Sequence, residues 1–462
     1  LFEVGERTEL SCFEGLRVLS MLWVVLGHIL AVQASVGYTN PEAVFPPNGL
    51  VSQLVGQLFF SARFAVDTFF FVSGFLVVYV MLRRFGSSMD DGGDGSNGRN
   101  GGKGGGNGRG LGRLSDWLPF FYVHRILRIT PIYMVCLLVW WKVAVFLGEG
   151  PFWYRWQYFI ALCDRSWWTN LLYVNNVVPW HTSETEECFY HTWYLANDMQ
   201  FYVVSPFFIV LYLRNKALGA AATVGVLLAS VGAMMWGTYA RQWSALTFDG
   251  AWVVAYSEET YTQPWARIVP YLLGMMLAMF WDEKKRRWPR FKLNNAQRYL
   301  MMGGGIATLL TVTFAAHSAY ESVPCSVKQS PDTHDCGSHW PVWLHALYNA
   351  GSRPAWILGV SMLCFVCFNN QGGLIQQMLE HRGWTPFARL SFGAYLLHPL
   401  IINLWFLNTT TKFTFSKLDF VMIYICVTAA TFGCSLLLAL LVESPLTKLG
   451  KYLEIAMKPS KQ

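Results

Sequence analysis

The stretch GLRVLSMLWVVLGHIL, residues 15–30, places an arginine and a histidine in an otherwise apolar run. Arg17 and His28 are eleven residues apart in the sequence. On a helix they point within ~20° of each other and lie ~16 Å apart along the axis. One helix face therefore carries both polar groups, and the composition of the whole chain decides which solvent that helix meets.

The composition is that of a membrane protein. Of 462 residues, 53% are hydrophobic and 14% are charged, whereas soluble domains carry about 25% charged residues. Apolar runs of around 20 residues recur along the chain, each long enough to cross ~30 Å of hydrocarbon. We therefore predict an all-α, polytopic transmembrane helical bundle with about ten spans. They are 16–34, 54–80, 118–147, 192–213, 217–238, 264–282, 298–316, 343–368, 390–407 and 419–441.

The distribution of Lys and Arg predicts the orientation of these spans. If the N-terminus is cytosolic, the basic clusters within 99–128 and 282–292 and the C-terminal lysines all fall on the cytosolic side, as the positive-inside rule requires. Both ends of the chain are thus expected in the cytosol, with the protein in an endomembrane or the plasma membrane. This asymmetry explains the net charge of +7, so no nucleic-acid partner is inferred.

The spans form one domain, expected over residues 16–441. It is flanked by a cytosolic N-terminal segment (1–15) and a cytosolic C-terminal tail (442–462). Residues 86–112 are Gly-rich and polar, which predicts a flexible cytosolic linker within the domain. The chain begins without a methionine or a signal sequence, so we expect that an N-terminal portion has been removed.

The cysteines test the same topology. Cys163 and Cys188 share one predicted non-cytosolic loop, and Cys325 and Cys336 share another. Because that side can be oxidising, two disulfides are predicted, Cys163–Cys188 and Cys325–Cys336, with free thiols as the alternative. The CxxC motif of MLCFVCF (362–368) lies in a span without a nearby histidine or carboxylate. Packing is therefore expected there, and no metal site is predicted.

A second basic motif lies in YVHRILRITPIY, residues 122–133. Arg125 and Arg128 are spaced i, i+3 on one helix face, near the predicted cytosolic boundary where Arg17 also lies. Each guanidinium can donate two parallel hydrogen bonds to phosphate oxygens. The alternative is that these arginines only anchor the helix at the cytosolic interface.

Together these groups predict a binding site for a phosphorylated carrier. Its head could dock on the arginines, Arg17, Arg125 and Arg128, while a thin arm reaches ~16 Å along the first helix to His28. Histidine can act as a general base near neutral pH. The expected step is attack of an acceptor hydroxyl on a thioester, with His28 taking the hydroxyl proton.

At this point the sequence resembles a known family, acyltransferase 3, and within it the animal nose-resistant-to-fluoxetine-like proteins. In that family the spacing of Arg17 and His28 is the signature of the first span, and an RxxR motif falls on Arg125 and Arg128. Five motifs carry the resemblance over nearly the whole chain: GLRVLSMLWVVLGH, RFAVDTFFFVSGFLVVY, HRILRITP, HTWYLANDMQFYVVSP and ARLSFGAYLLHPLI.

The resemblance implies an integral membrane acyltransferase. An acyl group would pass from a cytosolic acyl-CoA-like donor to a lipid or small hydroxylated acceptor at or across the membrane. His28 would be the catalytic base, and Arg17, Arg125 and Arg128 would bind the donor phosphates. Acyl-CoA is then a co-substrate, and no permanently bound cofactor is expected.

Two acidic positions are assigned more weakly. Arg63 and Asp67 are four residues apart on one helix face and are expected to neutralise each other. Asp67 also matches the acidic position of the family motif, which leaves a channel-lining role open. Asp198 falls where bacterial relatives usually carry Glu, so its role is in doubt.

The remaining polar residues have two interpretations each. Trp193, Asp198 and Gln200 either line the acceptor side or pack within the bundle. His398 is expected mainly as a structural hydrogen-bonding group, with a direct catalytic role as the alternative.

Two other functions compete with the enzyme. A lipid or small-molecule transporter could use the same cavity without chemistry, because intramembrane charges also mark substrate pathways. A catalytically silent protein could handle lipid or yolk through partners, but loss of the histidine would be its expected signature, and His28 is present.

Overall fold

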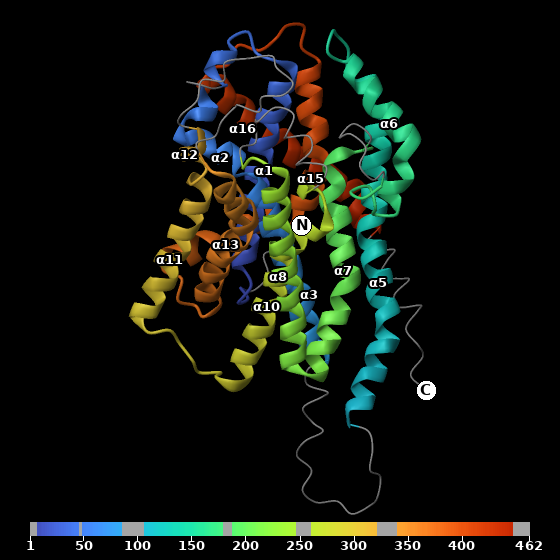
Figure 1. The fold of residues 1–462 in the computed structure, drawn as a ribbon. Coiled ribbons are helices and arrows are strands. Elements are labelled where there is room, and N and C mark those ends of the chain that lie inside the picture. The colour runs from blue at the N-terminus through green and yellow to red at the C-terminus, as the bar shows by residue number, and fades with distance from the viewer. Residues whose placement is uncertain are drawn as a thin grey trace, which may run out of the picture.

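The predicted apolar runs all form long helices, which run alongside one another in a bundle (Figure 1). The computed structural model describes residues 7–45, 49–85, 106–178, 187–245, 260–320 and 340–446. The ten long helices are α1 (Cys12–Val36), α3 (Arg63–Phe85), α5 (Gly106–Leu138), α7 (Trp193–Arg214), α8 (Lys216–Arg241), α10 (Pro264–Arg287), α11 (Asn295–Phe314), α13 (Val342–Phe368), α15 (Trp384–Leu407) and α16 (Lys417–Leu438).

Shorter helices connect or extend them. A π-helical turn, η4, and a 3₁₀ turn, η5, prolong α5, and another π-helical turn, η9, prolongs α16. The shorter elements are η1 (Pro41–Ala43), η2 (Leu50–Ser52), η3 (Leu54–Gly56), α2 (Gln57–Phe60), η4 (Val139–Val143), η5 (Ala144–Leu147), α6 (Tyr154–Leu171), η7 (Tyr190–Thr192), α12 (His317–Tyr320), α14 (Gly373–Leu379) and η9 (Ala439–Glu443).

Among the described residues, eight helical segments are long and apolar enough to cross a membrane. The two other long helices, α7 and α10, have 22 and 24 residues. They are long enough to cross, at ~33 and ~36 Å, but they carry more polar and charged side chains. The chain is a polytopic, all-helical, integral membrane protein, as predicted.

Several predicted boundaries need correction. The second span begins at Arg63, because residues 54–60 form the separate short helices η3 and α2. The predicted Gly-rich linker ends earlier than expected, since α5 already begins at Gly106. The rest of that linker, residues 86–105, lies outside the described residues, as do the Cys325–Cys336 disulfide and most of the C-terminal tail.

Local sequence signals set several helix ends. The Asn215 side chain caps α8 by accepting hydrogen bonds from the backbone N–H groups of Ala217 and Leu218. Asn294 and Gln297 form a capping box at the start of α11. These side chains satisfy backbone N–H groups that have no partner within the helix.

Two apolar cores hold the bundle together. One joins mainly α1, α5, α15 and α16, and the other joins mainly α3, α7, α10 and α13. In the second core, α3 and α10 approach closely at Gly74 and Gly274. A Cβ at Gly74 would lie 2.2 Å from the Tyr271 carbonyl oxygen, and a Cβ at Gly274 would lie 2.1 Å from that of Phe71. Only glycine allows this packing.

Candidate active site

Two histidines meet inside the first core. His28 on α1 and His398 on α15 have ring centroids 4.9 Å apart, and Nε2 of His398 lies 3.4 Å from Nδ1 of His28. His398 is fully buried, whereas His28 is half-buried. They meet because α1 and α15 run parallel and in contact. The hydrogen bond between Arg17 and Ser391, nearer the starts of the same two helices, shows the same arrangement.

Backbone carbonyls assign the protons on these rings. Nδ1 of His398 lies 2.7 Å from the carbonyl oxygen of Tyr395, and Nδ1 of His28 lies 3.0 Å from that of Val24. A carbonyl oxygen only accepts, so both Nδ1 atoms carry hydrogen in neutral rings. Nε2 of His398 then accepts from His28 Nδ1–H. This arrangement leaves the lone pair of His28 on Nε2, where it can take up a proton.

A third histidine adjoins the pair and was missed by the sequence analysis. The ring centroid of His191, in η7, lies 5.5 Å from that of His398. His191 is buried, and neither of its ring nitrogens has a hydrogen-bond partner within the described part of the chain. It opens the HTWYLANDMQFY motif, from which only three later residues were singled out. Its position in that motif was the available signal.

The segment that carries His191 is held by a covalent and polar scaffold. Cys188 is bonded to Cys163, which is the first of the two predicted disulfides. The Asn170 side chain donates to the Cys188 carbonyl oxygen at 2.9 Å and to the Thr192 hydroxyl at 3.0 Å. Between them, Phe189 adopts a left-handed conformation with φ of 55°. A non-glycine residue in this conformation is strained, so the surrounding contacts must fix it.

Of the three arginines predicted to bind phosphate, Arg17 and Arg128 lie near each other. Arg17 is half-buried and donates a hydrogen bond to the Ser391 hydroxyl at 3.2 Å. Arg128 is exposed, and its charge is near enough to Arg17 for the two to repel each other. The Glu14 and Glu443 carboxylates lie near enough to Arg17 and Arg128, respectively, to offset part of this repulsion. Two like charges in one place still favour an anion between them.

Arg125 has a different environment. It forms an ion pair with Asp198 on α7, and its guanidinium lies 4.1 Å from the centroid of the Tyr202 ring. Although Arg125 and Arg128 are spaced i, i+3, the first is held against α7 and the second is exposed. The charge of Arg125 is thereby largely balanced within the protein.

The predicted Arg63–Asp67 pair is wrong. Asp67 has no exposed surface and forms an ion pair with Arg267 on α10 at 2.8 Å, with Arg353 on α13 at 3.9 Å from its other oxygen. Arg63 instead lies over the rings of Phe64 and Tyr348. A fully buried carboxylate needs a fully buried cation. Helices α10 and α13 supply cations from the bundle interior.

Trp193 and Gln200 also lie within the bundle. The Trp193 ring lies 4.8 Å from the guanidinium of Arg267. The Gln200 amide donates to the Tyr173 carbonyl oxygen and to the side-chain oxygen of Asn176, each at 2.8 Å. Gln200 therefore holds the turn that follows α6. Packing and positioning explain the contacts of both residues.

The cysteines of the CxxC motif are buried free thiols in the second core, as the packing prediction requires. Within the described ranges, no group of three or more His, Cys, Asp or Glu side chains is arranged to hold a metal ion.

These observations define a class, an integral, multi-pass helical membrane protein with a histidine site enclosed in its bundle. A family model described as an acyltransferase domain matches residues 10–440. The chain therefore belongs to the acyltransferase 3 family.

Two relatives from Caenorhabditis elegans are similar to this chain. "Nose resistant to fluoxetine protein 6" is 25% identical over 460 residues, which cover 96% of this chain and 51% of that protein. "Regulator of hypoxia-inducible factor 1" is 21% identical over 369 residues, or 71% of this chain and 62% of that protein. The chain thus spans about half to three fifths of these relatives. No solved structure matches it.

Proposed function

We propose that this protein is a membrane acyltransferase that moves an acyl group from a cytosolic acyl-CoA-like donor to an acceptor hydroxyl. The observation that carries the proposal is the state of His28. Its Nδ1–H is fixed by the Val24 carbonyl oxygen and by His398, so its Nε2 lone pair is directed away from these partners. Family membership supports acyl transfer as the reaction.

The donor binds at the end of α1 that carries Arg17. Arg17 and the exposed Arg128 bind its phosphates, because both are permanently charged and their mutual repulsion is relieved by an anion. Arg125 attracts the donor phosphates more weakly, because its charge is balanced by the ion pair with Asp198. From Arg17 the distance along α1 to His28 is ~16 Å, which matches the length of a pantetheine arm.

The chemistry follows from this placement. His28 Nε2 removes the proton of the acceptor hydroxyl as its oxygen attacks the thioester carbonyl carbon. The tetrahedral intermediate then collapses, the carbon–sulfur bond breaks, and the CoA thiolate takes the proton from the His28 imidazolium. His398 acts as a positioning residue that keeps His28 in one tautomer. Both histidines are neutral before and after the cycle.

The test of donor docking is turnover by the purified chain in nanodiscs containing native lipid extract. Acetyl-CoA and a long-chain acyl-CoA are supplied separately, and release of the free CoA thiol is measured. We expect Arg17→Ala and Arg128→Ala each to raise KM about tenfold or more, since each loses a charged hydrogen bond. Arg214→Ala, an exposed arginine at the end of α7, is the matched control.

Two outcomes overturn the proposal in different ways. If both donors are consumed but the Arg17 and Arg128 variants keep the wild-type KM, the docking site is elsewhere. If neither donor is bound or consumed, the protein is not an acyl-CoA-dependent enzyme, and transport or lipid handling through the same site takes its place.

A further inference from the structure

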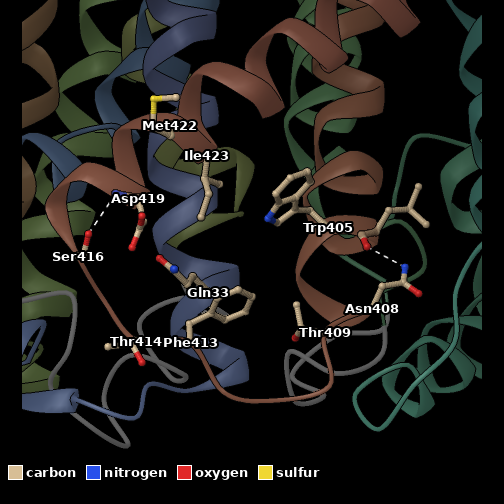
Figure 2. Close-up of a pocket in the computed structure, with 11 residues that line it drawn as sticks. Gln33, Trp405, Asn408, Thr409, Phe413, Thr414, Ser416, Asp419, Met422 and Ile423 are labelled. Carbon is tan, nitrogen blue, oxygen red and sulfur yellow. Dashed lines mark hydrogen bonds between the residues drawn. The ribbon is translucent and has the colours of Figure 1, made fainter.

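A cavity of about 660 Å³ lies at the end of α1 away from Arg17. Figure 2 shows the residues that line it. It is formed by the last turns of α1 and α15, the connection between α15 and α16, and the first turns of α16. Its lining residues are Gln33, Leu404, Trp405, Asn408, Thr409, Phe413, Thr414, Ser416, Asp419, Met422 and Ile423.

The cavity lies on the far side of the histidines from the arginines. Gln33 is five residues beyond His28, or ~8 Å further along α1. On α15, Trp405 is seven residues beyond His398, which places it two turns away, ~10 Å along the axis and on nearly the same face. The cavity and Arg17 therefore lie on opposite sides of the histidine pair along the helix axes.

Within the described residues, three polar groups in the cavity have no hydrogen-bond or ion-pair partner: the Gln33 amide N–H₂, the Asp419 carboxylate and the Trp405 indole N–H. Gln33 is 3% exposed, and its side-chain oxygen accepts from the Tyr38 hydroxyl at 3.2 Å, but its amide N–H₂ donates to nothing within the described chain. The Asp419 carboxylate has no ion pair there either, and the indole N–H of Trp405 has no acceptor. In Figure 2 these three groups face the same space.

Other polar lining groups are already occupied. Asn408 donates to the Leu404 carbonyl oxygen at 2.8 Å, and its side-chain oxygen accepts from the Glu149 N–H at 2.7 Å. The Thr409 hydroxyl donates to the Phe406 carbonyl oxygen at 2.9 Å. The Thr414 hydroxyl pairs with that of Thr39 at 2.7 Å, and the Ser416 hydroxyl accepts from the Asp419 N–H at 3.2 Å. The groups left open to a ligand are thus the Gln33 and Trp405 N–H donors, the Asp419 carboxylate and the hydrogen of the Ser416 hydroxyl. That set suits a head group with hydroxyl or ammonium groups and repels an anion.

The surface beside the cavity is apolar. On α16, Leu418, Val421, Met422 and Ile425 are 71%, 50%, 55% and 54% exposed. In a chain that spans a membrane, such a face lies against lipid tails. A polar cavity beside it fits a molecule with a polar head and an alkyl tail.

We propose that this cavity binds the acceptor, an amphipathic lipid whose head is uncharged or cationic and carries hydroxyl or amino groups. Its head contacts Gln33, Trp405 and Asp419, and its tail lies along α16. The role of this lipid as the acceptor rests on the proposed acyltransferase function. Its binding to the cavity does not require turnover.

The test uses three photoreactive probes with the same dodecyl chain and a diazirine next to the head. The heads are glucoside, trimethylammonium and phosphate. The full chain in nanodiscs is irradiated with each, and labelled peptides are identified by mass spectrometry. We expect saturable labelling of residues 404–423 by the glucoside and trimethylammonium probes, at least fivefold above the phosphate probe.

Variants make the result specific. Thr409→Trp should fill the cavity and remove the labelling, and Asp419→Asn should lower the trimethylammonium-to-phosphate ratio at least fivefold. Glu42→Gln removes an exposed carboxylate outside the cavity and should change neither. Size-exclusion profiles verify that each variant is folded.

Equal labelling by all three probes, or labelling that survives Thr409→Trp in a folded protein, would overturn the proposal. Measuring acyl-CoA consumption by the same wild-type preparation separates the two hypotheses. Specific labelling of a wild-type protein that consumes no acyl-CoA would keep the lipid site and remove the reaction. Turnover without specific labelling would keep the reaction and remove this site.

Discussion

At the scale of single residues, Asp67 is a buried carboxylate that depends on buried cations for its stability. It has no exposed surface, and the guanidinium of Arg267, also fully buried, pairs with it. Arg353 approaches its second oxygen. Removing the carboxylate would leave the fully buried Arg267 without its ion-pair partner.

We therefore expect Asp67→Ala to destabilise the protein by about 3–5 kcal/mol, the usual cost of breaking a buried pair from one side. Arg63→Ala is the comparison. If Asp67 were paired with Arg63, as the sequence predicted, this substitution would destabilise the protein as much as Asp67→Ala. It should cost clearly less than Asp67→Ala, because Arg63 is half-buried and its guanidinium lies over the Phe64 and Tyr348 rings. The measurement is thermal unfolding in detergent. Equal losses for the two variants would contradict the buried pair.

A second residue-scale prediction concerns pH. Burial alone would raise the pKa of Glu9, but hydrogen bonds from Lys285 and Tyr79 lower it below its ordinary value of 4.5. A lowered folded-state pKa means that Glu9 stabilises the folded state above pH 4.5 and that this contribution is lost as the pH falls below that value.

Glu9→Gln should therefore lower the free energy of unfolding at pH 7 by less than about 1 kcal/mol, because the pair is partly exposed. As the pH falls below 4.5 and through the lowered pKa of Glu9, the variant and wild type should converge. Unfolding curves between pH 3 and 7 test this. A constant difference across that range would show that the ion pair with Lys285 contributes nothing.

The residue scale is also where sequence reasoning had its limits. Arg17 and His28 were found because both lie on one helix at a fixed spacing. The partners of Asp67 are 200 and 286 positions away, so only the packing of three helices reveals them. His191 lay inside a quoted motif, but nothing in the sequence indicated that η7 would bring it to His398.

At the scale of elements, helix contacts depend on a few glycines. The α3–α10 contact places Gly274 against the Phe71 carbonyl oxygen, where a Cβ would be 2.1 Å away. Backbone cannot move aside as a side chain can, so the helices must separate to admit a methyl group.

Gly274→Ala should therefore cost about 1–3 kcal/mol. Gly303→Ala on α11 has nothing within 4 Å of its added Cβ and should be neutral or slightly stabilising, since alanine favours helix. Thermal unfolding of the two single variants gives the comparison. A Gly274→Ala protein as stable as Gly303→Ala would mean that α3 and α10 are not this close.

The elements themselves were the most predictable level of the fold. All ten apolar runs form helices, because apolar stretches of about 20 residues have few other stable states in a membrane. Their ends were less predictable. The start of α3 at Arg63, after the short helices η3 and α2, depends on local turns that hydropathy does not report.

At the scale of the whole molecule, the charge asymmetry predicts that both ends of the chain face the cytosol. Either eight or ten crossings give an even number and place the two ends on one side. Topology is tested by introducing an Asn-x-Ser glycosylation acceptor in the 148–152 turn and, separately, in the 86–105 segment. We expect modification only in the first, because only that side meets the glycosylation machinery. The reverse pattern would invert the orientation.

In the proposed architecture, the donor site and the acceptor cavity lie on opposite sides of one histidine, His28. Phosphates bind beside Arg17 and Arg128 at one end, and the cavity beside Gln33 opens at the other. His28 lies between them on α1, ~16 Å from the first and ~8 Å from the second along the axis. A base at this depth explains why a membrane helix carries two costly polar groups.

The most direct test of this account is a single-turnover measurement on His28→Gln beside wild type, with purified protein in nanodiscs in excess over acyl-CoA. We expect the acyl-transfer rate to fall at least 10²-fold, as loss of a general base implies, while the Kd of acyl-CoA stays within twofold. An unchanged rate in a variant that still binds the donor would contradict the role of His28 as the base.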